Sequence, residues 1–229
     1  MWRRTAISSR WYTMKNKTGN QFDHLPTYKS RLQSVVLLLS VLTIAVLVRI
    51  SVDFSTPLMP KVNGAYYLVQ ARSVAERGEL VYNTSFFLVF WISGKLANVL
   101  HFIRGGDLSD SVILACKLVD SILPAFACIP IFLLSCNWNN RKYSIVGTCV
   151  IPALFSVLYY PALVMTSDFQ KNAVGMVWFS FLIYFLYRSI CLPRISNLLA
   201  VGVALLLGSI THVGAFGATL AYGLITVVI

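Results

Sequence analysis

The chain has 229 residues, of which 57% are apolar and only 12% are charged, and its mean hydropathy is +0.72. A soluble domain carries about 25% charged residues, so this composition excludes a water-soluble globule and predicts a membrane protein. The net charge of +11 would suit a nucleic-acid-binding protein, but no RNA- or DNA-binding motif accompanies it, and we expect no nucleic-acid partner.

Several apolar runs reach about 18 residues or more, the length that a helix needs to cross a bilayer. The runs are continuous rather than alternating, which favours helices over a β-barrel. We therefore expect an all-α fold, a polytopic transmembrane bundle of about six or seven spans that is integral to the membrane. The expected organisation is a basic cytoplasmic tail over residues 1–31 and a transmembrane domain over residues 32–229.

The tail contains seven basic residues against one acidic residue. The basic residues are Arg3, Arg4, Arg10, Lys15, Lys17, Lys29 and Arg31, and the acidic residue is Asp23. Cytoplasmic segments next to a span carry such an excess of Lys and Arg, so the N-terminus is expected in the cytoplasm. We expect the tail to be mostly disordered and to contact anionic membrane lipid. No cleavage site of small residues follows the first apolar run, which predicts a signal anchor.

The first span is expected over residues 32–52, with Arg49 near its end extending to the outer headgroups. Asp53 then opens a polar segment, residues 53–85, which we expect to be the first outer loop. It contains the largest group of charges outside the tail.

Within the outer loop, residues 65–77 have a helical period and predict an amphipathic helix that is too polar to span the membrane. Gly78 stands in the C-cap position that ends it. Its expected apolar face consists of Ala65, Leu68, Val69, Ala71, Val74 and Ala75, and its polar face of Gln70, Arg72, Ser73, Glu76 and Arg77.

Further spans are expected over residues 85–103, 112–136, 143–164, 171–190 and 195–209, with a last run over residues 214–229. Pro124, Pro130 and Pro152 are expected to kink these spans. The five cysteines lack the spacing of a zinc site and are interpreted as small buried side chains. Because the chain ends inside an apolar run, we expect the transmembrane domain to be incomplete at its C-terminus.

Two topologies are compatible with the positions of the basic loops. If every run crosses, the loops at residues 141–142 and 188–194 fall outside, where the positive-inside rule disfavours them. If residues 85–103 do not cross fully, both basic loops fall inside and the loop at residues 107–110 falls outside.

Three motifs lie in the first outer loop and in two later runs. They are Asn63-Gly64-Ala65-Tyr66-Tyr67 followed by Arg72, Gly78, Leu80 and Tyr82; Lys117-Leu118-Val119-Asp120 followed by Pro124; and Met165-Thr166-Ser167-Asp168 followed by Lys171 and Asn172. With the first span they look like the GT-C glycosyltransferases, which include the protein O-mannosyltransferase, aminoarabinose transferase and oligosaccharyltransferase branches. The similarity covers most of residues 32–190.

The resemblance implies a sugar donor carried on a polyprenyl phosphate and an outer-loop carboxylate that acts as a base or as a metal contact. Asp53 and Asp168 are the expected catalytic carboxylates, and a divalent cation is the cofactor that the family pattern allows. The expected substrate-binding residues are Asn63, Tyr66, Tyr67, Arg72, Glu79, Lys171 and Asn172. Many relatives carry Asp where Asn63 stands, and the amide of Asn cannot act as a base. Two alternatives therefore remain: the chain is inactive, or it uses a different acid.

Several of these residues also have a purely structural interpretation. Asp53 could be an ordinary helix-end carboxylate, and Tyr66 and Tyr67 could belong to an aromatic belt. Lys117 and Asp120, on one helical face, are either an intramembrane site or a mutually paired bridge. We expect a membrane glycosyltransferase that acts at the outer face. The alternatives are a non-enzymatic transporter or flippase-type protein, or a truncated inactive homologue.

Overall fold

Helices make up all the regular structure in the described part of the chain. The computed structural model describes residues 28–59, 63–81, 87–138, 144–159, 163, 169–212, 214, 216–217 and 220–221. The expected all-α fold is therefore confirmed for these residues. The chain divides into residues 1–37 and residues 38–229, and all packing below is within the second unit. The tail to residue 27 lies outside the described residues.

Three helical stretches in the described residues are long and apolar enough to cross a membrane: Leu32–Asp53, Leu108–Asn137 and Gln170–Cys191. The first is most of α2 (Tyr28–Asp53), which begins inside the expected tail, and the last is α9 (Gln170–Cys191). The middle stretch consists of α5 (Leu108–Ile122), a 3₁₀ turn η1 (Pro124–Ala127) and α6 (Cys128–Trp138). These stretches match three of the expected spans.

Prolines interrupt the apolar helices at two of the expected places. Pro124 lacks a backbone N–H and turns the helix into the 3₁₀ segment between α5 and α6. Pro152 follows the π-helical segment η2 (Val146–Val150) at the start of α7 (Ile151–Leu158). The described helix here is shorter than the expected span over residues 143–164.

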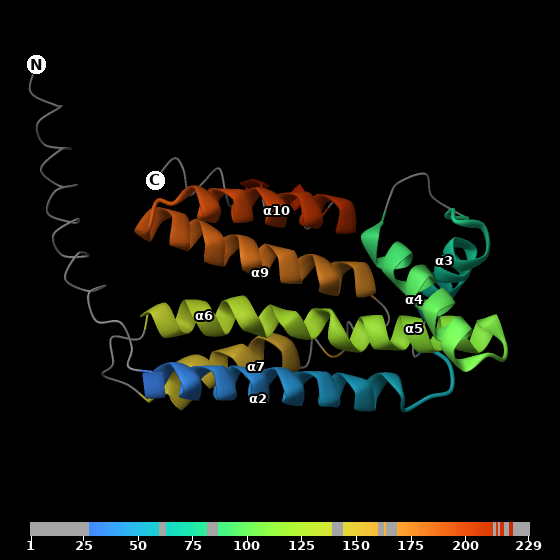
Figure 1. Ribbon diagram of the computed structural model, residues 1–229, viewed down its shortest axis with the longest axis horizontal. Coiled ribbons are helices and arrows are strands. Elements are labelled where there is room, and N and C mark those ends of the chain that lie inside the picture. Colours follow the sequence, from blue (N-terminus) through green and yellow to red (C-terminus); the bar gives the residue numbers. More distant parts are fainter. Residues whose placement is uncertain are drawn as a thin grey trace, which may run out of the picture. The chain divides into compact units, whose positions relative to one another are not determined.

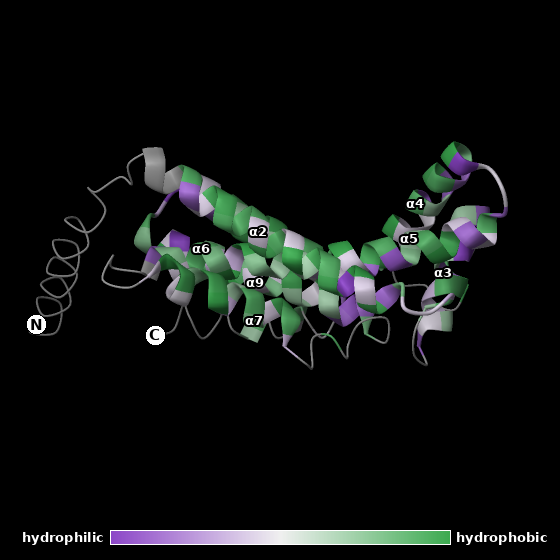
Figure 2. Cartoon of the chain, turned by 90° about the horizontal axis from the view of Figure 1, so that it is seen from below, coloured by the Kyte–Doolittle hydropathy of each residue, from purple (hydrophilic) through white to green (hydrophobic). Residues whose placement is uncertain are grey.

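The later helices follow the prediction closely where they are described. α10 (Ile195–Thr211) matches the expected run over residues 195–209 and packs along α9. Most of the expected last run, residues 214–229, lies outside the described residues. Figure 2 shows hydrophobic residues along α2, α6 and α9, with polar residues concentrated around α3.

The outer-loop helix α3 (Gly64–Arg77) forms as expected, and Gly78 ends it with a positive φ of 70°. Its buried face differs from the expected one, because Gln70 and Ser73 are buried. Gln70 Oε1 accepts from the backbone N–H of Val81 at 3.0 Å, and Ser73 Oγ donates to the carbonyl of Glu79 at 2.6 Å. These polar side chains are buried because they bind the backbone of the following loop.

The run expected as a second full span forms α4 (Leu88–Arg104), whose 17 residues pack against α3 and α5. It is not among the three candidate spans of the described residues. Figure 1 shows α3, α4 and α5 gathered at one end of the unit, beside the ends of α9 and α10. Gly94 lets α4 approach α3 closely, since a Cβ there would lie 2.7 Å from Val74 Cβ and 2.8 Å from the Ala71 carbonyl oxygen.

Candidate functional site

Charged side chains meet where α2 ends. Arg49 and Asp120 are buried, and the Arg49 Nε donates to the Asp120 backbone carbonyl at 3.2 Å. Arg49 Nη2 lies 3.8 Å from Asp120 Oδ1. The expectation that Arg49 extends to the headgroups is therefore wrong, because an acidic partner on α5 holds the guanidinium inside the protein.

Asp53 lies one helical turn beyond Arg49, is fully buried, and accepts a hydrogen bond from Ser121 Oγ at 2.6 Å. The neighbouring Lys117 donates to the backbone carbonyl of Thr56 and lies 5.1 Å from the centre of the Phe54 ring. Lys117 and Asp120 therefore contact different partners, the former the loop after α2 and the latter Arg49 on α2. Four side chains form this buried charge cluster: Arg49, Asp53, Lys117 and Asp120. Their two positive charges balance their two negative charges.

A cavity of about 70 Å³ lies beside the buried charge cluster. Its lining residues are Arg49, Pro124, Ala127, Ser156, Val157, Tyr159, Ala173 and Met176.

Lys171, in the first turn of α9, lies among three aromatic rings. Its Nζ is 4.4 Å from the ring centre of Phe87, 5.4 Å from that of Tyr66 and 5.6 Å from that of Phe90. The side chain is half-buried and has no hydrogen-bond or ion-pair partner among the described residues. Cation–π contacts stabilise an ammonium group by about 0.5–2 kcal/mol and leave its charge unneutralised. The Lys171 site, meaning Lys171 with Tyr66, Phe87 and Phe90, can therefore receive an anion.

A second basic side chain lies near Lys171. His212 directly follows α10, and its pKa is lowered by burial and then by the positive charge of Lys171. His212 therefore stays neutral at neutral pH.

Tyr67 packs beside the Lys171 site. Its side chain is 3% exposed, and its ring centre lies 5.6 Å from that of Tyr66 and 5.7 Å from that of Phe90. Burial raises the pKa of Tyr67 to about 12, while the nearby backbone N–H groups of Lys171 and Gln170 oppose this increase and the charge of Asp120 adds to it. Gln170 is fully buried and donates through Nε2 to the carbonyl of Cys116 at 3.1 Å, next to Lys117 in the chain.

The pKa of Tyr67 gives stability an alkaline dependence. Between pH 10 and about 12 the folded protein keeps a phenol proton that the unfolded chain loses, so the free energy of unfolding should fall as pH rises through this window. Below pH 10 this contribution is complete. Denaturant unfolding at a series of pH values should show the decline in the wild type and a shallower one in Tyr67→Phe. An equal decline in both proteins would contradict the prediction, and Tyr184→Phe controls for loss of a phenol elsewhere.

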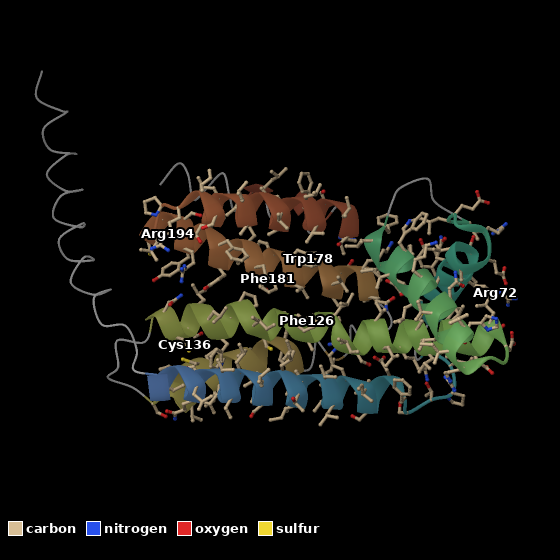
Figure 3. All side chains as sticks on the ribbon, in the orientation of Figure 1. Arg72, Phe126, Cys136, Trp178, Phe181 and Arg194 are labelled. Atoms are coloured by element: carbon tan, nitrogen blue, oxygen red, sulfur yellow. The ribbon has the colours of Figure 1, made fainter. Side chains whose placement is uncertain are left out.

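The other expected substrate-binding residues are distributed differently. Arg72 is exposed, with its Nε 2.7 Å from Glu76 Oε1 and its Nη1 3.3 Å from Ser109 Oγ (Figure 3). Asn63 and Glu79 are also exposed, at the two ends of α3, and Asn172 is partly buried in α9. Asp168 lies outside the described residues.

Sequence reasoning missed Ser121, Gln170, Phe87 and Phe90, and assigned Arg49 no role in the site. Burying a charge within a span costs free energy unless the charge has a partner. Arg49 was therefore the residue from which the sequence could have indicated the buried charge cluster. Phe87 and Phe90 belong to an aromatic apolar run, where nothing in the pattern distinguishes them from lipid-facing residues. The described residues contain no group of three His, Cys, Asp or Glu side chains that could hold a metal ion.

No protein-family model, curated protein or solved structure matches this chain. Its class therefore rests on its own fold, which is all-helical in the described residues and contains three helices long and apolar enough to cross a membrane.

Proposed function

We propose that the protein is a membrane glycosyltransferase that moves a sugar from a polyprenyl-phosphate donor to an acceptor at the outer membrane face. The observation that carries the proposal is the half-buried Lys171 ammonium, which lies among three aromatic rings and lacks an anionic partner in the described residues. Burying a cation without a counter-charge is unfavourable, so such a site favours an anionic ligand.

Lys171 suits the phosphate group of a lipid donor. When the bond from sugar to phosphate breaks, negative charge develops on the phosphate leaving group, and a fixed cation stabilises it in a site with little water. The rings of Tyr66, Phe87 and Phe90 exclude water from the ammonium and offer an apolar surface to the sugar or to the first isoprene unit.

A carboxylate is needed to take the proton of the acceptor hydroxyl. Asp168 is three residues before Lys171 in the chain, which favours it as this base. Asp53 is fully buried against Ser121, which favours a role in holding the end of α2 beside α5. A divalent cation, if the enzyme uses one, would need Asp168 as a ligand. Asn63, Arg72, Glu79 and Asn172 complete the substrate contacts that the resemblance to the GT-C family implies.

The positions of the basic residues support the topology in which α4 does not cross. Arg194, before α10, and Arg72, on α3, lie at opposite ends of the described unit (Figure 3). If the α3 end faces outside, Arg188 and Arg194 face the cytoplasm with the basic tail, as the positive-inside rule favours. The proposal therefore puts α3, α4 and the start of α5 at the outer surface. The protein then has fewer complete spans than its sequence has apolar runs.

Lys171→Gln should lower the rate of sugar transfer in proteoliposomes by roughly 100-fold or more, because it removes the positive charge proposed to hold the phosphate. Lys171→Arg should keep part of the activity. Lys95→Gln is the matched control, since Lys95 is an exposed lysine on α4 whose Nζ lies 6.0 Å from the centre of the Trp91 ring. Transfer that survives unchanged in Lys171→Gln would reject the proposal.

A transporter or flippase-type protein is the second candidate, favoured by the buried charge cluster. Transport through that cluster requires Lys117 or its partners to contact the solute. Lys117→Leu would then abolish solute movement while Lys171→Gln leaves it intact. The glycosyltransferase proposal predicts instead that Lys171→Gln strongly lowers sugar transfer, whereas Lys117→Leu affects it less.

A further inference from the structure

The last two turns of α4 expose a group of large apolar side chains. Phe102 is 89% exposed, Ile103 is 71% exposed and Val99 is 53% exposed. Arg104, the last residue of α4, is exposed as well. We call Val99, Phe102, Ile103 and Arg104 the α4 tip. Large apolar side chains that are exposed as a group, rather than singly, mark a contact surface.

The opposite side of α4 is packed inside the protein. Ser93, Gly94 and Ala97 are buried there, and Gly94 approaches Val74 on α3. An α-helix has about 3.6 residues per turn, so Val99 lies nearly opposite Ala97. Helix α4 therefore buries its small side chains and exposes large apolar ones. In water the reverse is favourable, whereas helices in lipid commonly pack through small residues and direct large apolar side chains outward.

The neighbouring helix α3 exposes charge instead. Its exposed residues include Arg72, Glu76 and Arg77. Helix α4 contains no Asp or Glu, and its last residue, Arg104, adds a positive charge next to the apolar side chains of the α4 tip. Figure 2 shows mainly hydrophobic residues along α4 and more hydrophilic ones around α3. An exposed apolar surface that is accompanied by a cation is typical of a helix in a lipid interface.

Lipid suits the α4 tip better than a second protein does. A stable protein interface takes about 800 Å² from each partner. Even an aromatic side chain contributes only about 150–250 Å², so three apolar side chains at the end of one helix fall short of that area. Insertion to a depth of about 5–10 Å below the headgroups needs no larger surface. The guanidinium of Arg104 can pair with a headgroup phosphate above the inserted side chains.

We propose that the α4 tip inserts into the lipid interface, with Val99, Phe102 and Ile103 among the upper acyl chains and Arg104 at anionic phospholipid headgroups. This contact supplies an apolar environment for a helix that, in the proposed topology, does not cross the membrane. The inference rests on the outer-surface position of α4 that accompanies the proposed function, and it does not require sugar transfer.

Tryptophan fluorescence of the full-length protein in phospholipid vesicles tests the insertion. Phe102→Trp adds one tryptophan to the five of the native chain, whose emission is measured in the wild type and subtracted. Most of the added emission should be lost when the vesicles contain phosphatidylcholine brominated close to the headgroup. Iodide, a quencher confined to water, should leave it unchanged. Glu76→Trp, at an exposed position of α3, is the matched control and should show the opposite behaviour.

A second comparison tests the contact of Arg104 with headgroups. In vesicles of equal parts phosphatidylcholine and phosphatidylglycerol, Phe102→Trp should lose more emission when the phosphatidylglycerol carries the bromine than when the phosphatidylcholine does. The added substitution Arg104→Gln should remove most of this difference. An equal loss with either lipid while Arg104 is present would overturn the headgroup contact.

Three other outcomes would overturn the insertion, and the exposure of Phe102 means that its replacement leaves the packing of α4 intact. Loss of the added emission to iodide alone would put the α4 tip in water. No loss to either quencher would show that protein covers it, as a second copy or another partner. The largest loss with lipids brominated at the chain ends would put Phe102 near the bilayer centre and would contradict the proposed topology as well. The effect of Lys171→Gln on sugar transfer is independent of all three, so the proposed function stands or falls separately.

Discussion

Asp120→Asn is expected to lower the free energy of unfolding by about 3 kcal/mol, because it leaves the buried guanidinium of Arg49 without its carboxylate. Arg49 is 1% exposed and cannot reach water without a change in the packing of α2. The loss should be visible as a lower midpoint of denaturation for the protein purified in detergent.

Two comparisons isolate the buried pair. The double variant Arg49→Met with Asp120→Leu should recover most of the loss, since Asp53 and Lys117 still balance each other and the replacements are apolar. Glu76→Gln breaks the exposed pair between Glu76 and Arg72, whose atoms are closer at 2.7 Å, and should lower the free energy of unfolding far less than Asp120→Asn, because water screens the exposed charges. Additive losses in the double variant would show that the two charges do not compensate each other.

The apolar helices could be predicted from the sequence because length and composition alone determine whether a run suits a bilayer. The runs at residues 32–52, 112–136 and 171–190 each correspond to a candidate span among the described residues. The break at Pro124 was equally accessible, since a missing N–H acts locally. These features depend on each segment by itself.

The buried face of α3 could not be predicted from hydrophobic periodicity. Gln70 and Ser73 were assigned to water because their side chains are polar, yet both are buried against the loop that follows the helix. A hydrogen bond from each side chain to the loop backbone offsets part of the cost of removing these groups from water. Finding them requires knowing where the loop backbone returns, which periodicity does not report.

The parts of the candidate site were recognisable one by one, but not the way they combine. Lys171 and Tyr66 were both singled out, and the structure brings them together. The spacing of Lys117 and Asp120 left open a mutual bridge or an intramembrane site, and the structure shows that Lys117 contacts Thr56 and Asp120 contacts Arg49. The partners come from segments more than 60 residues away, and pairings at that separation depend on how the helices pack.

The same dependence on packing explains α4. Its composition suits a span, but Gly94 gives it a surface that fits against α3, and Asn98 Nδ2 donates to the Ala75 carbonyl at 3.1 Å. Small residues that allow backbones to approach are a common basis of helix pairing. The orientation of α4 therefore depends on whether this close contact is preserved.

Gly94→Ala should destabilise the protein by about 2 kcal/mol, since the added methyl group would lie 2.7 Å from Val74 Cβ and 2.8 Å from the Ala71 carbonyl oxygen. The two helices must separate to admit it, which also moves Tyr67 on α3. Gly202→Ala is the matched control in α10, where nothing lies within 4 Å of the new Cβ, and it should be neutral or stabilising by up to about 1 kcal/mol. Thermal unfolding of both variants in the same detergent measures the difference. Equal stability would mean that α3 and α4 do not pack through Gly94, and the outer-surface arrangement of α4 would lose its support.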